Sequence, residues 1–329
     1  MRVPKKILSI FLRIGISVIL LFFYFKINKI NVPDLLKNIK NADKYLLFWA
    51  FCIFTLSYIL CLFRWEMLLK AVKIHLPLKR IIISFSGGIF FSLFLPSTIG
   101  GDLIRSIDLA THTKRPKEVI ATVLLDRLSG YTGLVALALL SLVLGWRFVH
   151  DNKNVLFCVA IITAILIAIL SVLFNRFLYS KINKFLHSPN AGRIRELIKN
   201  LHQEIHYFKH HKRVIVNNLF FSILVQAASP IAFFITALSL GIKMNIVYFF
   251  IFLPIIGAIT LLPISIGGLG VRETVTTIFF VKAGMVKDLA GAMSIINSFF
   301  IFVCGAIGGL IYVLTVSHRR IQHHKSLPI

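Results

Sequence analysis

The stretch Leu95-Pro-Ser-Thr-Ile-Gly-Gly-Asp-Leu-Ile-Arg105 has a second copy at residues 262–272, which reads Leu-Pro-Ile-Ser-Ile-Gly-Gly-Leu-Gly-Val-Arg. The two copies agree at six of eleven positions and begin 167 residues apart. Each copy ends an apolar run with a proline, a glycine pair and an arginine. Interrupted backbone is tolerated in a bilayer only where it lines a cavity within the protein or one filled with water. Two matching interruptions in two halves of a chain therefore predict a binding site near the middle of a membrane.

The helix-breaking residues of the two copies are the expected hinges, namely Pro96, Gly100, Gly101, Pro263, Gly267, Gly268 and Gly270. The alternative is a pair of surface loops, because glycine and proline also mark ordinary turns.

Composition places the chain in a membrane. Hydrophobic residues make up 57% of its 329 residues and the mean hydropathy is +0.86, which is typical of a polytopic membrane protein. The formal net charge of +25 is spread over short loops, and this pattern favours contact with anionic lipid over binding of nucleic acid. All four cysteines fall inside apolar runs, so we expect neither a disulfide framework nor a metal site.

Eight apolar runs are candidates for membrane helices. They lie near residues 7–25, 45–62, 81–96, 119–146, 155–174, 214–239, 246–262 and 289–316. The runs 81–96 and 246–262 break at the glycine pairs and return through 102–112 and 271–283, so we predict two re-entrant helical hairpins and six full spans. The fold class is thus an all-α polytopic membrane protein, residues 1–329 forming a single membrane domain. Residues 7–146 form a first repeat and residues 155–316 a second one of inverted topology.

Positive charge in the loops predicts the orientation. The 175–213 segment holds nine Lys and Arg residues, and the 63–80 segment holds five, so both are expected in the cytoplasm together with the two termini. The basic 26–44 segment conflicts with this arrangement, because it lies on the outer side. Apolar residues recur at three- and four-residue spacing in 194–208, which predicts an amphipathic helix within 175–213 that lies on the inner leaflet or packs on its neighbours. His202, His206 and His210 share a face of that helix, and we interpret them as a polar flank rather than a metal site.

Six charged residues fall at membrane depth, where each costs at least ~2.5–3.5 kcal/mol on insertion scales. They are Asp102, Arg105, Asp126, Arg127, Arg272 and Glu273. Arginine binds phosphate through a planar, two-pronged set of donors, so these residues predict a site for a lipid phosphate. The alternative is that they only pair with one another and lock helices together. Because Asp126 and Arg127 point about 100° apart on a helix, each is expected to find its partner elsewhere, most naturally in the hairpins.

Arg105 and Arg272 follow their glycine pairs by the same number of residues, so inverted symmetry predicts that they form one phosphate-binding pair. In that hypothesis Asp102, Asp126 and Glu273 keep the empty site neutral and exchange partners when a phosphate enters. Arg64 and Trp65, which follow the second apolar run, are interpreted as an anchor at the membrane interface.

Taken in order, these motifs resemble a family of flippase-like membrane proteins named after the transmembrane region of lysylphosphatidylglycerol synthase. The residues that carry the resemblance span nearly the whole chain: Phe63-Arg64-Trp65, Leu68-Leu69, Pro96, Gly100-Gly101-Asp102, Arg105, Asp126-Arg127, Gly130, Pro263, Gly267-Gly268-Leu-Gly270-Val-Arg272 and Glu273. The resemblance implies a translocase that moves an aminoacylated or otherwise modified lipid between leaflets. The tail at 317–329 is too short for the synthase's soluble aminoacyltransferase domain, so we do not expect that activity.

The sequence thus predicts a lipid translocase of the prokaryotic cell membrane, with no cofactor and no enzymatic activity. Its cargo is a phospholipid, a glycolipid or a polyprenyl-linked lipid, and a separate lipid-modifying enzyme is a candidate partner. Two other classes fit the pattern: an ion-coupled transporter of a small solute, and an accessory membrane subunit of lipid or glycan assembly. The enzyme class lacks a Ser/His/Asp constellation, an HExxH motif and a phosphate loop.

Overall fold

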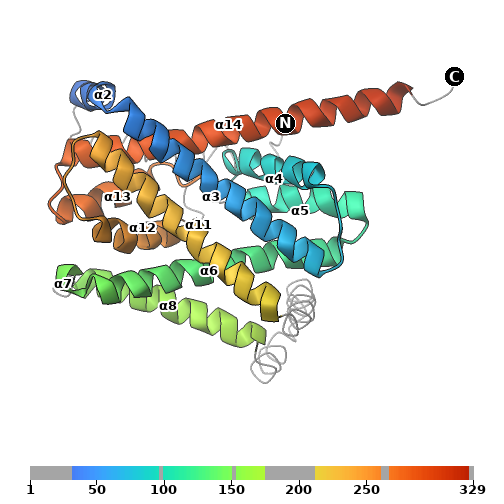
Figure 1. Cartoon of the computed structure of the whole chain (residues 1–329), viewed down its shortest axis with the longest axis horizontal. Coiled ribbons are helices and arrows are strands. Elements are labelled where there is room, and N and C mark those ends of the chain that lie inside the picture. Colours follow the sequence, from blue (N-terminus) through green and yellow to red (C-terminus); the bar gives the residue numbers. More distant parts are fainter. Residues whose placement is uncertain (1–31, 96–98, 150–152, 175–211, 261–266, 326–329) are drawn as a thin grey trace, which may run out of the picture.

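A computed structural model describes residues 32–95, 99–149, 153–174, 212–260 and 267–325. In these ranges the chain is helical, with turns between the helices, which confirms the all-α class (Figure 1). The helices are α2 (Val32–Asn41), α3 (Lys44–Ala71), α4 (Leu78–Ser92), α5 (Ile99–Thr113), α6 (Pro116–Leu144), α7 (Trp146–Val149), α8 (Lys153–Phe174), α11 (Lys212–Ser239), α12 (Ile246–Thr260), α13 (Val271–Lys282) and α14 (Lys287–Lys325). The expected first span at 7–25, the hinge prolines Pro96 and Pro263, and the 175–211 part of the basic segment lie outside the described residues.

The long helices begin and end where local signals place them. Asp43 precedes α3, and its carboxylate accepts hydrogen bonds from the backbone N–H groups of Tyr45 at 2.8 Å and Leu46 at 3.2 Å. Pro116 occupies the first turn of α6, where no donor is needed. Four stretches are long and apolar enough to cross a bilayer: Lys44–Ala71, Pro116–Leu144, Arg213–Ser239 and Lys287–Thr315. The count of six full spans stays a prediction.

The surface of these helices is inverted relative to that of a water-soluble protein. Val143 and Leu144 on α6 are 75% and 74% exposed, whereas Asp126 on the same helix is 3% exposed. Apolar side chains therefore face outward, as lipid requires, and charge is enclosed.

Two helical hairpins form at the predicted places. α4 packs against α5, and α12 packs against α13. α4 and α12 have 15 residues each, which gives a length of about 22 Å, shorter than the ~30 Å hydrocarbon core of a bilayer. Half-length helices paired in this way fit re-entrant hairpins, and Figure 1 shows α12 and α13 on the left and α4 and α5 on the right of the molecule.

The two glycine pairs differ in conformation, and their role as hinges stays a prediction. Gly100 and Gly101 lie within the first turn of α5. A Cβ on Gly101 would lie 2.2 Å from the carbonyl oxygen of Gly88, so this glycine permits α4 and α5 to touch. Gly267 and Gly268 have φ values of 59° and 77° and form a turn that other residues rarely adopt. Gly270, with a φ of 80°, continues this turn up to α13.

The hairpins meet at their tips. A Cβ placed on Gly267 would lie 3.7 Å from the carbonyl oxygens of both Ser92 and Leu93. The second glycine pair thus meets the end of α4.

Packing relations in one half recur in the other. Within the first half α6 contacts α3 and α5, and within the second half α14 contacts α11 and α13 in the same way. Between the halves, α4 contacts α14 and α12 contacts α6. α3 and α11, which occupy equivalent places in the two halves, pack against each other. This exchange of partners is what an inverted repeat requires, and the superposition of 7–146 on 155–316 stays a prediction.

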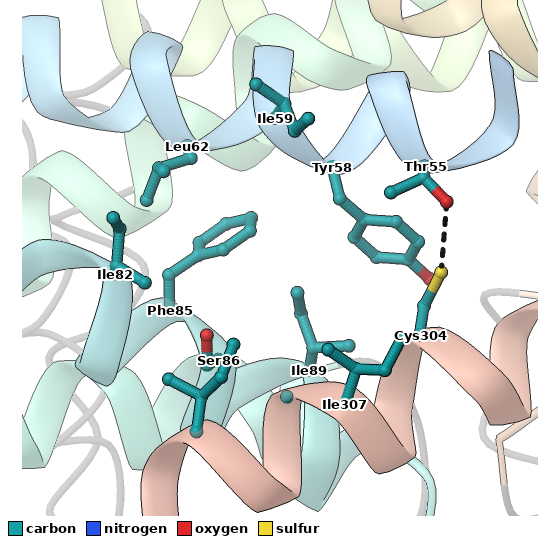
Figure 2. A pocket seen from close by; sticks show the side chains of 12 residues that line it. Thr55, Tyr58, Ile59, Leu62, Ile82, Phe85, Ser86, Ile89, Cys304 and Ile307 are labelled. Carbon is teal, nitrogen blue, oxygen red and sulfur yellow. Dashed lines mark hydrogen bonds between the residues drawn. The ribbon is translucent and has the colours of Figure 1, made fainter. Parts of the chain in front are cut away.

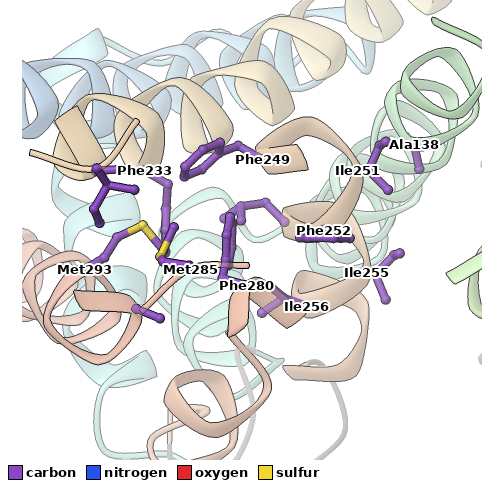
Figure 3. Close-up of a cluster of buried hydrophobic side chains, with 14 of the residues drawn as sticks. Ala138, Phe233, Phe249, Ile251, Phe252, Ile255, Ile256, Phe280, Met285 and Met293 are labelled. Atoms are coloured by element: carbon purple, nitrogen blue, oxygen red, sulfur yellow. The ribbon is translucent and has the colours of Figure 1, made fainter. Parts of the chain in front are cut away.

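An aromatic cluster holds the second hairpin in place (Figure 3). The ring centroid of Phe280 on α13 lies 4.8 Å from the ring centroid of Phe249 and 5.4 Å from that of Phe252, and both of these residues are on α12. Met285 and Met293 complete the buried contact. Between α4 and α14 the contact instead uses small residues: a Cβ on Gly308 would lie 2.8 Å from the carbonyl oxygen of Ser86. Close backbone approach of this kind is a common way for helices to associate in lipid.

A buried arginine–aspartate cluster as the candidate functional site

Five charged side chains form one connected chain of ion pairs. Asp126 on α6 binds Arg64 through Oδ1 at 2.7 Å and Arg105 through Oδ2 at 2.9 Å. The Nε atom of Arg105 lies 3.0 Å from Oδ1 of Asp102, one turn earlier on α5. Asp102 in turn accepts two hydrogen bonds from Arg127, one from Nε and one from Nη2, and the second is 2.9 Å long. α3, α5 and α6 are therefore joined by charge inside the bundle.

The direction of each side chain follows from helix geometry. Asp126 and Arg127 are neighbours on α6 and point about 100° apart, so they reach different partners. Both find a partner on α5, in the first hairpin, as expected. Arg64 also donates from Nη1 to the hydroxyl of Ser222 on α11 at 3.0 Å. The cluster is thereby tied to the second half of the chain.

Trp65 fixes the plane of the Arg105 guanidinium. The Cζ atom of Arg105 lies 4.7 Å from the centroid of the Trp65 ring, a cation–π distance. Trp65 is fully buried, and its indole N–H donates to the hydroxyl of Thr122 at 3.3 Å. The ring and its hydrogen bond hold the guanidinium in one orientation before any ligand arrives.

The cluster carries an excess of positive charge. Three arginines face two aspartates, so one positive charge has no counterpart within the set. Arg105 is 3% exposed, and its Nη1 atom has no hydrogen-bond partner in the part of the chain that the structure describes. A buried cation with an open donor is costly, and an anion with hydrogen-bond acceptors would relieve that cost.

A cavity of about 240 Å³ adjoins the cluster. Its lining includes all five charged residues together with Tyr58, Cys61, Phe85, Gly88, Ile89, Ser92 and Gly101. Two apolar grooves continue from it. One, of about 580 Å³, runs between α5 and α6 and shares Asp102 and Arg127 with the cavity. The other, of about 170 Å³, lies between α3, α4 and α14 and shares Tyr58, Phe85 and Ile89 (Figure 2).

Arg64 was wrongly interpreted as an interface anchor. The apolar run that suggested an end near residue 62 continues as helix α3 to Ala71, so Arg64 lies inside the helix and is 4% exposed. A basic residue just past an apolar run resembles an anchor in sequence. Only the carboxylate of Asp126, brought in from α6, shows that it is a partner in a buried ion pair.

The second hairpin differs from the first in its charges. Arg272 donates from Nη2 to the carbonyl oxygen of Gly267 at 2.7 Å. Glu273 accepts the N–H of Gly270 at 2.6 Å and the hydroxyl of Ser298. No salt bridge of the described residues includes either side chain. Glu273 lies in the first turn of α13 and caps that helix, and its exchange between arginines stays a prediction.

Arg272 nevertheless lies near the cavity. Its guanidinium binds the carbonyl oxygen of Gly267, a Cβ on Gly267 would lie 3.7 Å from the carbonyl oxygen of Ser92, and Ser92 lines the cavity. The pairing of Arg105 with Arg272 around one phosphate stays a prediction.

A second buried ion pair lies within the first hairpin and was not expected from the sequence. Arg80 on α4 is 5% exposed, and its Nη2 atom lies 2.8 Å from Oδ2 of Asp108 on α5. The hydroxyl of Ser84 donates to the same carboxylate. In the sequence, Arg80 is among the five basic residues of the 63–80 segment, which is interpreted there as a loop. The available signal was the spacing of Asp102, Arg105 and Asp108 at three-residue intervals, which continues one charged face along α5.

Among the described residues no group of three or more His, Cys, Asp or Glu side chains is placed to hold a metal ion. His202, His206 and His210, which the sequence places on one face of a helix, lie outside the described residues.

Two comparisons place the chain among known proteins. The model of a family described as the lysylphosphatidylglycerol synthase transmembrane region matches residues 10–309. A UPF0104 membrane protein of Methanothermobacter thermautotrophicus is 22% identical, over 93% of this chain and 92% of its own length. Another UPF0104 membrane protein, from Pyrococcus horikoshii, is 22% identical over 92% of this chain and 95% of its own. The match over nearly the whole chain, together with apolar helices and buried charge, shows that this membrane protein belongs to the lysylphosphatidylglycerol synthase transmembrane-region family.

Proposed function

We propose that the protein moves an anionic lipid between the leaflets of the cell membrane and binds the lipid phosphate at the arginine–aspartate cluster. The observation that carries this proposal is the unbalanced positive charge of the cluster together with the open Nη1 donor of Arg105. Phosphate oxygens match a guanidinium in geometry and in charge. Binding and release of such a ligand involve no bond making or breaking, so no catalytic group is needed.

The two apolar grooves favour a lipid over a small solute. A phosphate in the cavity would lie beside the α5–α6 groove, which begins at Asp102 and Arg127, and beside the α3–α4–α14 groove, which begins at Tyr58 and Phe85. A ligand with a charged head and hydrocarbon chains fits a polar cavity flanked by apolar grooves. A small polar solute would leave both grooves unused.

The proposed cargo is a membrane phospholipid, a glycolipid or a polyprenyl-linked lipid, since all three join a phosphate to hydrocarbon. In this proposal a separate lipid-modifying enzyme supplies the cargo to the translocase. The family to which the chain belongs is named after a lipid-modifying synthase, which supports this role.

A leaflet-resolved assay tests the proposal. The purified full chain is placed in liposomes that contain fluorescent phosphatidylglycerol, phosphatidylcholine or a glycolipid, and a membrane-impermeant quencher reports the fraction in the outer leaflet over time. We expect faster exchange of the anionic lipid than in empty liposomes, and loss of that gain in Arg105→Ala. Arg115→Ala is the matched control, because the Arg115 side chain is 41% exposed and, among the described residues, contacts Glu118 and the carbonyl oxygen of Lys73. Equal rates with and without protein for every lipid would overturn the proposal, and solute flux without lipid movement would favour the small-solute transporter.

A further inference from the structure

A second polar cluster lies between α13 and α14, outside the arginine–aspartate cluster. Glu273 and Thr276 lie one turn apart on α13, and Ser294, Asn297 and Ser298 occupy one face of α14. The two helices pack against each other, and the hydroxyl of Ser298 donates to Oε1 of Glu273. All five side chains are at most 5% exposed. We call this set the α13–α14 oxygen cluster.

Hydrogen bonding leaves several oxygens of the cluster without partners. Thr276 Oγ1, Ser294 Oγ and Asn297 Oδ1 are buried and make no hydrogen bond in the described part of the chain. The amide nitrogen of Asn297 donates to the carbonyl oxygen of Met293 at 2.9 Å, which leaves its oxygen as the free end. Three orphaned oxygens beside a buried carboxylate are unusual, because buried polar groups normally find partners.

Helix capping explains only part of this arrangement. The Oε2 atom of Glu273 accepts the Gly270 N–H at 2.6 Å, which is an ordinary role for a glutamate at the third position of a helix. It does not explain why Thr276, Ser294 and Asn297 present unused oxygens on the adjoining faces.

The first half of the chain shows what is missing. Asp102 and Arg127 are 25 residues apart and form an ion pair between α5 and α6. Glu273 and Ser298 are also 25 residues apart and join α13 to α14, the corresponding helices of the second half. The carboxylate of the α5–α6 pair therefore has a fixed cation as its partner, whereas the carboxylate of the α13–α14 pair has a neutral hydroxyl.

We propose that the α13–α14 oxygen cluster binds one monovalent alkali cation, with sodium as the ion of choice. A carboxylate, hydroxyls and an amide oxygen form a hard, all-oxygen set of donors, and hard cations prefer such ligands. One carboxylate balances one positive charge. A divalent ion would leave a net charge in the apolar interior, and a transition metal would favour nitrogen or sulfur ligands.

The position of the site connects the ion to the hairpin tip. Glu273 holds the N–H of Gly270, at the end of the turn that begins with Gly267. Gly267 is the residue that meets Ser92 and Leu93 of the first hairpin. A bound cation would draw Glu273 toward α14 and thereby fix the turn against α14.

Sodium binding by the purified full chain in detergent tests the proposal. We expect about one ²²Na⁺ bound per chain, displaced by unlabelled sodium and not by choline. At a sodium concentration about ten times the dissociation constant we expect Tm to rise by about 2 °C relative to choline chloride of equal ionic strength. The assay needs no lipid movement, so its outcome is independent of the proposed translocation.

Variants separate ion binding from capping. Glu273→Gln retains a side-chain oxygen that can cap α13 and removes the charge, so we expect it to fold and to lose both the ²²Na⁺ binding and the Tm rise. Thr276→Val and Ser294→Ala should weaken sodium binding several-fold. Asp43→Asn is the matched control, since Asp43 is also a capping carboxylate and asparagine caps equally well. A Glu273→Gln protein that binds sodium as the wild type does, or a wild type that binds none, would overturn the proposal.

Discussion

The Nη2 atom of Arg105 lies 2.9 Å from Oδ2 of Asp126, and this ion pair joins the first hairpin to α6. The carboxylate of Asp126 is shared with Arg64 on α3, so three helices depend on one anion. A ligand phosphate that takes Arg105 would compete directly with Asp126 for the guanidinium. Binding and the position of the hairpin are therefore linked through one side chain.

Arg105→Lys should lower the rate of lipid exchange at least about tenfold, although the charge is kept. Lysine cannot contact Asp102 and Asp126 together, and it lacks the planar group that stacks on Trp65; loss of one charge-assisted hydrogen bond of about 1.5–3 kcal/mol accounts for such an effect. The rate is measured in liposomes at matched protein content, with Arg115→Lys as control. A wild-type rate in both Arg105→Lys and Arg105→Ala would assign Arg105 a purely structural role.

Asp126→Asn should destabilise the protein by about 3–5 kcal/mol, because two buried guanidinium groups lose their shared anion. Adding Arg64→Gln removes one of those cations, so the double variant should be more stable than Asp126→Asn alone. Denaturant midpoints in detergent measure both effects. Glu118→Gln, at a partly exposed ion pair, serves as control and should cost less than about 1 kcal/mol. A double variant less stable than the single one would contradict the shared-anion explanation.

The sequence predicted the helices well because their signals are local. Apolar runs gave the helices, and the Pro and Gly-Gly interruptions gave the two hairpins. The charges of the first half were also found, since isolated charges in apolar runs are conspicuous. Arg64, the second partner of Asp126, was missed because it is 62 residues away, on a helix whose end cannot be read from hydropathy. The capping role of Glu273 was not predicted, because it depends on the N–H that Gly270 presents at the start of α13.

Gly101→Ala should separate the first hairpin and abolish lipid exchange. The added Cβ would lie 2.2 Å from the carbonyl oxygen of Gly88, and neither backbone can move without shifting Arg105. Gly257→Ala on α12 is the matched control, because the nearest atom to its Cβ would be 3.7 Å away. We expect the Gly257→Ala protein to have a Tm equal to or higher than that of the wild type. A Gly101→Ala protein with wild-type Tm and exchange rate would show that the close approach of α4 and α5 is dispensable.

Residues 73 and 243 should lie on opposite sides of the membrane. The backbone N–H of Asp43 donates to the carbonyl oxygen of Ser239 at 2.9 Å, so the start of α3 adjoins the end of α11, and residue 73 follows the far end of α3. In a background with every cysteine replaced by serine, Lys73→Cys should react with an impermeant maleimide from the cytoplasm and Lys243→Cys from outside. Labelling of residue 243 from the cytoplasm would reverse the orientation, and labelling of both from one side would contradict the fold.

The contact between the hairpin tips should be required for transport. A Cβ on Gly267 would lie 4.0 Å from the Cα atom of Leu93, so cysteines at these two positions are close enough for a short bifunctional thiol reagent to bridge. In the cysteine-free background, Leu93→Cys combined with Gly267→Cys should be cross-linked by a short bis-methanethiosulfonate, and lipid exchange should stop and return on reduction. Each single variant controls for the strain that cysteine introduces at the positive φ of Gly267. We expect the cross-link to stop exchange because the polar cavity adjoins Ser92 at one tip, so that separation of the tips would open a path for the lipid head. Unchanged exchange in the fully cross-linked protein would mean that the lipid travels by a route that leaves the tips together.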